Sequence, residues 1–122
     1  MDAGGAVDVA AALADLPGPY QPARVGTYND NKLLVARIHG EFPWHAHADT
    51  DDFFLVIDGR MTLRLRDAPD VELGPGELYV VPAGVEHCPY AAEPCHVLLI
   101  ERIGTVNTGD AGGPLTVAEP ER

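Results

Sequence analysis

The sequence predicts an all-β domain, on the basis of its turn content and the spacing of its apolar runs. Glycine (13 residues) and proline (11 residues) are abundant in a chain of 122 residues, which implies many turns. Between residues 20 and 103, short apolar or alternating runs are separated by turn signals at intervals of roughly 8–12 residues, which is typical of a β-sandwich or β-barrel. A chain of this length accommodates one such domain.

We expect three parts along the chain, namely an N-terminal helical segment (1–19), a β domain (20–104) and a C-terminal tail (105–122). In the first part, residues 6–16 are rich in alanine, and Val9, Leu13 and Leu16 recur at helical spacing. Pro17 ends this predicted helix, which we expect to cover one end of the sheet. The tail is rich in glycine and proline, so we expect it to fray at its end unless it packs on a partner subunit.

The β domain contains predicted strands in the following order: 32–38, 53–57, 61–66, 71–73, 77–81, 86–90 and 96–103. Residues 53–57 are apolar throughout, which suits a strand that is covered on both faces. Asp58-Gly59 follows as a tight hairpin signal. In the next strand, apolar side chains alternate with Thr62, Arg64 and Arg66, which places the two arginines on the outer face.

The charge balance excludes two classes of partner. The chain has 19 Asp and Glu against 8 Lys and Arg, a formal net charge of −11. Such a surface repels phosphate backbones and anionic lipids, so we expect neither a nucleic-acid nor a membrane partner. The chain has no apolar run near the roughly 20 residues of a membrane helix. Residues 1–16 lack the basic start of a secretory signal, and we therefore expect a cytoplasmic protein.

The two cysteines, Cys88 and Cys95, are expected to be free thiols in a reducing compartment. Pro89 and Pro94 bound the segment between them, and a hairpin there would place the thiols side by side. A regulatory disulfide is therefore the alternative.

The histidines carry the predicted chemistry. His45 and His47 are two residues apart, so on a strand both imidazoles project to one face. The carboxylates of Asp49, Asp51 and Asp52 follow shortly, and His87 lies after a strand and turn that can fold back beside the first pair. Three neutral imidazoles and one carboxylate suit a divalent transition metal.

The spacing around these residues resembles the two motifs of the cupin family. The first motif resembles residues 40–47 (GEFPWHAH), followed by Asp52 and Gly59, and the second resembles residues 76–87, with Pro82-Ala83-Gly84 before His87. The resemblance covers about residues 25–103. It implies a double-stranded β-helix, a small jelly-roll barrel with a metal ion in its lumen.

By this resemblance, His45, His47 and His87 match the three histidine ligands, and Asp52 stands where the family usually has glutamate. Aspartate is one methylene shorter, so Asp52 either binds the metal directly, binds through water, or only hydrogen-bonds to a ligand histidine. Asp51 is an alternative to Asp52 as this carboxylate on the basis of its sequence position alone. The metal would be iron, manganese, nickel or zinc. His39 and His96 are expected to be ordinary barrel residues.

Three aromatic residues, Phe42, Trp44 and Tyr90, are candidates for the mouth of a substrate pocket, although plain packing at the barrel end is the alternative. Cys88 adjoins His87 and is expected to point away from the lumen. Arg64 and Arg66 also face away, which disfavours a sugar-phosphate isomerase.

The resemblance implies a metal-binding protein that acts on a small organic substrate, either an oxygenase or a Lewis-acid isomerase or cyclase. The alternative is a non-catalytic module that binds a small molecule with or without metal, since the cupin fold serves many functions. We expect a homodimer, because pairing would cover exposed strand edges.

Overall fold

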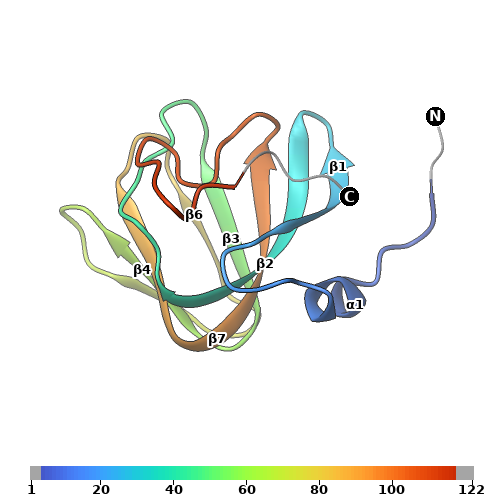
Figure 1. Cartoon of the computed structure of the whole chain (residues 1–122). Helices are drawn as coiled ribbons and strands as arrows, with labels where there is room; N and C mark the ends of the chain where they lie inside the picture. The colour runs from blue at the N-terminus through green and yellow to red at the C-terminus, as the bar shows by residue number, and fades with distance from the viewer. Residues whose placement is uncertain (1–3, 118–122) are drawn as a thin grey trace.

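The computed structural model describes residues 4–117 and is an all-β, double-stranded β-helix with a short N-terminal helix (Figure 1), which confirms the predicted fold class. The elements are α1 (Val9–Ala14), β1 (Ala23–Tyr28), β2 (Asn31–Glu41), β3 (Asp52–Asp58), β4 (Met61–Leu65), β5 (Val71–Leu73), β6 (Leu78–Val81) and β7 (His87–Arg102). No helix among the described residues has the length and apolar character that a membrane span requires.

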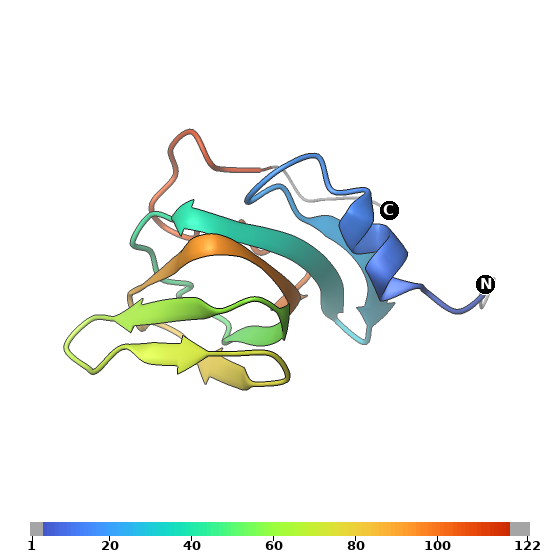
Figure 2. The ribbon, with the colours of Figure 1, turned by 90° about the horizontal axis from the view of Figure 1, so that it is seen from below.

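Strand β7 organises the barrel, because it contacts three other strands along its length. It pairs with β2 over nearly all of that strand, with β3 through its second half and with β4 through its first half. The sheet order is β1-β2-β7-β3-β6, while β4 pairs with β5 and β7. The long curved β2 and β7 therefore wrap the other strands around a common interior (Figure 2).

The continuity of β7 corrects the prediction of two strands, at 86–90 and 96–103, and of a possible hairpin between them. The β2–β7 register shifts between the pair Ile38 and Cys95 and the pair Gly40 and Ala91. The extra residues 92–94 form a bulge there, and the missing N–H of a proline costs no ladder bond at such a position. Cys88 and Cys95 are both free and buried.

The predicted turn at Asp58-Gly59 is present, but it is not a hairpin turn. Gly59 has φ +83°, and the strands on either side of it, β3 and β4, do not pair with each other. They pair with different halves of β7, so this turn connects two strands that lie beside different parts of β7. A Cβ at Gly59 would lie 2.9 Å from the Cα atom of Cys95, so only glycine allows β7 to pass this closely.

The core and the helix follow the predicted apolar pattern. Phe54, Val56 and Val97 point inward and are buried, together with Leu63 of β4. Helix α1 is shorter than the predicted 6–16; Asp8 caps it by accepting a hydrogen bond from the Ala11 N–H at 3.1 Å. Its buried residue Leu13, together with Leu16 just after the helix, packs with Val35 on the outside of β1 and β2 (Figure 2).

Residues 105–117 do not extend away from the barrel as a tail. They turn back from the end of β7 and cross the barrel at the end where the β2–β3 connection lies (Figure 1). Thr108 is completely buried, and Leu115 packs against the main core. We call residues 105–117 the C-terminal strap. The remainder of the predicted tail, residues 118–122, lies outside the described residues.

Candidate metal centre

The backbone fixes the two histidine-bearing segments against each other. His45 and His87 form an isolated antiparallel bridge, in which the His45 N–H donates to the His87 carbonyl at 3.0 Å and the His87 N–H donates to the His45 carbonyl at 2.8 Å. The Gly84 N–H donates to the His47 carbonyl at 2.8 Å. The His45–His47 segment is therefore held by β7 and by the turn before it, although it is not part of a regular strand.

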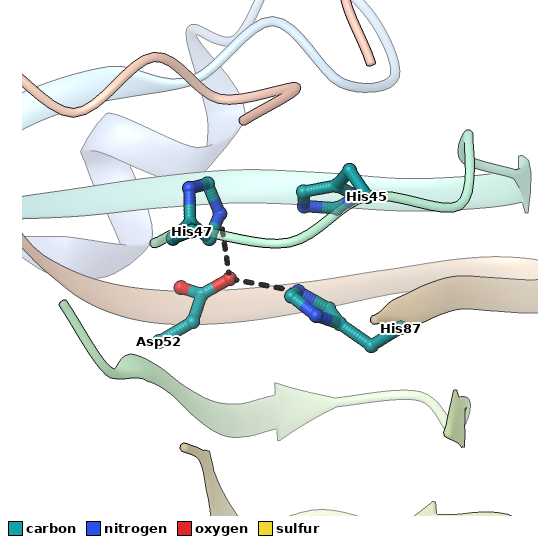
Figure 3. A group of neighbouring side chains, drawn as sticks. All are labelled: His45, His47, Asp52 and His87. Carbon is teal, nitrogen blue, oxygen red and sulfur yellow. Dashed lines mark hydrogen bonds and ion pairs between the residues drawn. The ribbon is translucent and has the colours of Figure 1, made fainter. Parts of the chain in front are cut away.

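Four side chains converge in the barrel interior, from His45, His47, Asp52 and His87 (Figure 3). One ligand atom from each lies within 4.8 Å of all the others, and all four residues are buried. Asp52 Oδ2 lies 3.2 Å from His87 Nε2 and 3.4 Å from His47 Nε2. A buried group of three imidazoles and one carboxylate is a potential metal site.

Two backbone carbonyls orient the imidazoles. His45 Nδ1 lies 2.8 Å from the Pro43 carbonyl oxygen, and His87 Nδ1 lies 2.9 Å from that of Val85. Because a carbonyl only accepts, we assign a hydrogen to each Nδ1, which leaves each Nε2 with a lone pair when the ring is neutral. The lone pair of His87 Nε2 then faces the anionic Asp52 Oδ2, and a cation, either a proton or a metal ion, must lie between them.

The electrostatics favour a neutral His45 and an anionic Asp52. Burial and the neighbouring His87 lower the pKa of His45 to about 4, so this imidazole is neutral at pH 7. Burial by itself would raise the pKa of Asp52, but the hydrogen bonds and charges of His47 and His87 hold it below its ordinary value. The second carboxylate oxygen, Oδ1, is buried and has no hydrogen-bond partner among the described residues. An anion with an unused buried oxygen fits a site for a cation.

The other predicted polar candidates lie elsewhere. Asp51 is exposed, and its Oδ1 accepts a hydrogen bond from the Ala83 N–H at 2.9 Å, so Asp52 is the carboxylate that meets the histidines. His39 is exposed. His96 lies 2.8 Å from the carboxylate of Asp58, outside the cluster.

Of the three predicted pocket aromatics, only Phe42 lies beside the cluster, with its ring edge-on to His45 at a centroid distance of 5.3 Å. The Trp44 ring lies beneath the guanidinium of Arg66 at 4.3 Å, and the Tyr90 ring lies beneath that of Arg64 at 4.7 Å. Neither borders the interior cavity. Alternation along β7 and β4 places Tyr90 on the outer face with Arg64, while Trp44 lies in the irregular segment after β2.

Cys88 lies opposite Arg64 in the β4–β7 ladder and is fully buried there. Its thiol donates to the Phe42 carbonyl at 3.1 Å. It does not border the interior cavity.

A small cavity of about 40 Å³ adjoins His45 and Asp52, and the sequence does not predict several of its walls. Tyr20 is one of them; it has φ +58°, its ring packs on Phe42 at 4.6 Å, and its hydroxyl donates to the Gly40 carbonyl at 2.6 Å. Phe54, Leu99, Glu101 and Asn107 also line this cavity. Alternation along β3 could have indicated Phe54, whereas Tyr20 and Asn107 lie outside both motifs.

Comparison with known proteins agrees with this geometry. The family model described as "Cupin domain" matches residues 34–101. The chain is 29% identical over 63 residues to the uncharacterized protein YdbB of Bacillus subtilis (strain 168), a match that covers 52% of this chain and only 56% of that protein.

Many solved structures are similar, among them the following two. A cupin-2 domain containing protein from Shewanella frigidimarina NCIMB 400 is 35% identical, with a TM-score of 0.76, over 79% of this chain and 93% of that chain. Hydroquinone 1,2-dioxygenase from Sphingomonas sp. TTNP3, with 4-hydroxybenzoate bound, is 23% identical, with a TM-score of 0.63, over 70% of this chain and 68% of that chain. The second likeness concerns the fold alone. With the family model covering more than half of its length, this chain belongs to the cupin family.

Proposed function

We propose that this protein binds one divalent transition metal ion through His45, His47 and His87, with Asp52 as the fourth group, and acts as a metalloenzyme on a small organic substrate. The observation that carries this proposal is the 3.2 Å separation of His87 Nε2 and Asp52 Oδ2, given that His87 Nδ1 is held by the Val85 carbonyl. A cation is required at that position, and three imidazoles around it suit a transition metal better than a proton alone.

The surrounding residues prepare the site. When bound, such an ion supplies Lewis acidity toward a substrate oxygen and, if it is redox-active, a place for dioxygen. His45 and His87 are pre-oriented by backbone carbonyls, and Asp52 offsets part of the metal charge in a buried setting. The apolar side chains of Phe42 and Phe54 border the cavity and give it part of its apolar wall.

Two reaction classes fit the site. The apolar walls, and the shared fold with a hydroquinone 1,2-dioxygenase, support an oxygenase. Glu101, a second buried carboxylate beside the cavity, supports a Lewis-acid isomerase or cyclase, because such a reaction needs a group that holds or moves a proton. Oxygen uptake by iron-loaded protein with candidate substrates would favour the first class, and turnover without oxygen the second. Tight ligand binding without turnover would favour the non-catalytic module.

The first test is the metal content of protein purified without an affinity tag, measured by plasma mass spectrometry. We expect near-stoichiometric iron, manganese, nickel or zinc in the wild type and almost none in His87→Ala. His96→Ala is the matched control, because that histidine lies outside the cluster and pairs with Asp58. A wild type that is empty and refuses added metal would overturn the proposal.

We also propose that the protein is a cytoplasmic homodimer. Two buried free thiols support a reducing compartment. For the dimer, the support is an apolar row on the outer face of β3 and its neighbours. In this row Phe53 lies opposite Val80 and Ile100, and Leu55 lies opposite Leu78 and Leu98. Contiguous apolar patches of this kind mark interaction sites.

A further inference from the structure

The C-terminal strap binds directly to the segment that carries two of the four candidate ligands. Ala46 lies between His45 and His47, and its N–H donates to Asp110 Oδ1 at 2.9 Å. The Asp110 N–H donates back to the Ala46 carbonyl at 3.2 Å. This reciprocal pair fastens the strap to the backbone of the histidine segment.

Gly109 makes the contact too close for any side chain. A Cβ at this position would collide with the Ala46 carbonyl oxygen and would lie 3.2 Å from His45 Cδ2. Gly109 also has φ +54°. By contrast, Gly112 has φ +64°, but a Cβ there would meet nothing within 4 Å. The strap therefore touches the histidine segment through Gly109 and is open to solvent at Gly112.

The strap is organised by hydrogen bonds of its own. The Asn107 side chain donates to the Leu115 carbonyl at 2.9 Å and accepts from the Val117 N–H at 2.9 Å. The hydroxyls of Thr108 and Thr116 are 2.7 Å apart. These bonds join the two ends of the strap, so they would persist if the strap left the barrel as one piece.

The space beneath the strap is too small for an organic substrate. Asn107 closes one side of the cavity of about 40 Å³ that His45 and Asp52 border. Sites for small organic molecules usually measure roughly 300–1,000 Å³. A groove of about 440 Å³ is bordered by His47 and, on the strap, by Gly109 and Asp110. Strap residues thus border both a groove of sufficient size and the small cavity next to the metal centre.

We propose that the C-terminal strap is a lid, which lifts from Ala46 as a unit and joins the outer groove to the inner cavity. Gly104, with φ +96°, precedes the strap and adopts a backbone conformation that residues with a side chain rarely adopt. The role of the lid in admitting substrate rests on the proposed function. The lifting motion itself does not, because it concerns only the contacts of the strap.

Residue-resolved amide hydrogen exchange on the full chain tests the lid, with Gly109→Ala as the opening variant and Gly112→Ala as the control with a similar φ. We expect the Ala46 and Asp110 amides to exchange at least about tenfold faster in Gly109→Ala, because their mutual hydrogen bonds are lost. The Val117 amide, bonded within the strap, should change less than about twofold, and Gly112→Ala should resemble wild type throughout.

Two results would overturn the lid. One is unchanged exchange at Ala46 and Asp110 in Gly109→Ala. The other is equal acceleration at Val117, which would mean that the strap unravels instead of lifting. If Gly109→Ala does not fold, Asp110→Ala replaces it: the amide at position 110, which donates to the Ala46 carbonyl, should then accelerate while the Val117 amide, bonded within the strap, does not, and the absence of that difference counts against the lid.

A second readout links the lid to the site. Apo protein is mixed with Co²⁺, and loaded protein is mixed with a chelator, while the visible spectrum is followed. We expect both entry and removal to be about tenfold faster in Gly109→Ala, with a much smaller change in equilibrium occupancy. Equal rates in variant and wild type would mean that the strap does not control access. If wild type binds no metal, the proposed function fails, and the exchange experiment still decides the lid.

Discussion

Asp52 Oδ2 lies 3.2 Å from His87 Nε2, although the two residues are 35 positions apart in the sequence. Strand β3 begins at Asp52 and β7 begins at His87, so both side chains project from the first residue of a strand into the same end of the barrel. Because the Val85 carbonyl holds the other nitrogen of His87, the contact requires a shared cation. The aspartate in place of the usual glutamate thus still reaches the histidines.

Changing Asp52 tests whether its charge or its length governs metal binding. We expect Asp52→Asn to weaken affinity about 10- to 100-fold, because the amide keeps the shape but loses the charge that offsets the metal. We expect Asp52→Glu to bind at least as tightly as wild type, since Asp52 borders a cavity that can take one more methylene. Competition titration with a chelator and Zn²⁺ or Co²⁺ measures both affinities.

Asp51→Asn is the matched control for this series, because Asp51 is the exposed neighbour whose carboxylate caps the Ala83 N–H. The metal affinity of Asp51→Asn should equal that of wild type. If Asp52→Asn binds as well as wild type, Asp52 is not part of the metal site, and its contacts with His47 and His87 serve folding only.

The sequence could predict the cluster because its signals are local. The spacing of His45 and His47 places both on one side of an extended segment, and the glycines and proline before His87 return the chain beside them. The choice between Asp51 and Asp52 was open from alternation alone, because either residue begins an alternating series. The packing decides it, because Asp52, Phe54 and Val56 form the buried series, whereas Phe53 and Leu55 are only half-buried and Asp51 is exposed.

Other features depend on tertiary contacts that leave no local signal. The strap is held by the backbone of Ala46 and by glycine at position 109. The sequence predicts only a glycine- and proline-rich tail there, which frays at its end unless it packs on a partner subunit. Pro89 and Pro94 suggested a break in β7, but one lies at the β4 pairing and the other in a bulge. Tyr20 lines the cavity from a backbone conformation with positive φ, and no pattern in the sequence predicts this conformation.

Alanine substitutions at two glycines with nearly equal φ distinguish the cost of backbone strain from the cost of a steric collision. Gly76 has φ +81° and open space around it, so Gly76→Ala should cost about 1–2 kcal/mol from the left-handed conformation alone. Gly59 has φ +83°, and a Cβ there would lie 2.8 Å from the Pro94 carbonyl oxygen. Gly59→Ala should therefore cost about 3 kcal/mol or more, since overpacking adds to strain. Urea unfolding of both variants measures the difference, and equal losses would show that β7 moves aside freely.

The two thiols should be inert in the folded protein and reactive once it is unfolded. Both cysteines are fully buried, and burial raises the pKa of Cys95 to about 11, so little thiolate is available at pH 8. With a maleimide reagent and no reductant, we expect no adduct under native conditions and two adducts per chain in denaturant, detected by mass spectrometry. Absence of labelling in denaturant would instead indicate a disulfide.

The outer face of β3 and β6 should govern the oligomeric state. Leu78 is 54% exposed and lies beside Leu55 in the apolar row, so a charge there would be buried without a partner in the proposed dimer. We expect wild type to sediment as a dimer and Leu78→Lys to sediment as a monomer at the same concentration. Tyr28→Lys is the control, because this substitution adds the same charge at a different place. Tyr28 is 64% exposed on β1, at the opposite edge of the β1-β2-β7-β3-β6 order. A dimeric Leu78→Lys would place the interface elsewhere, and a monomeric wild type would remove the dimer from the proposal.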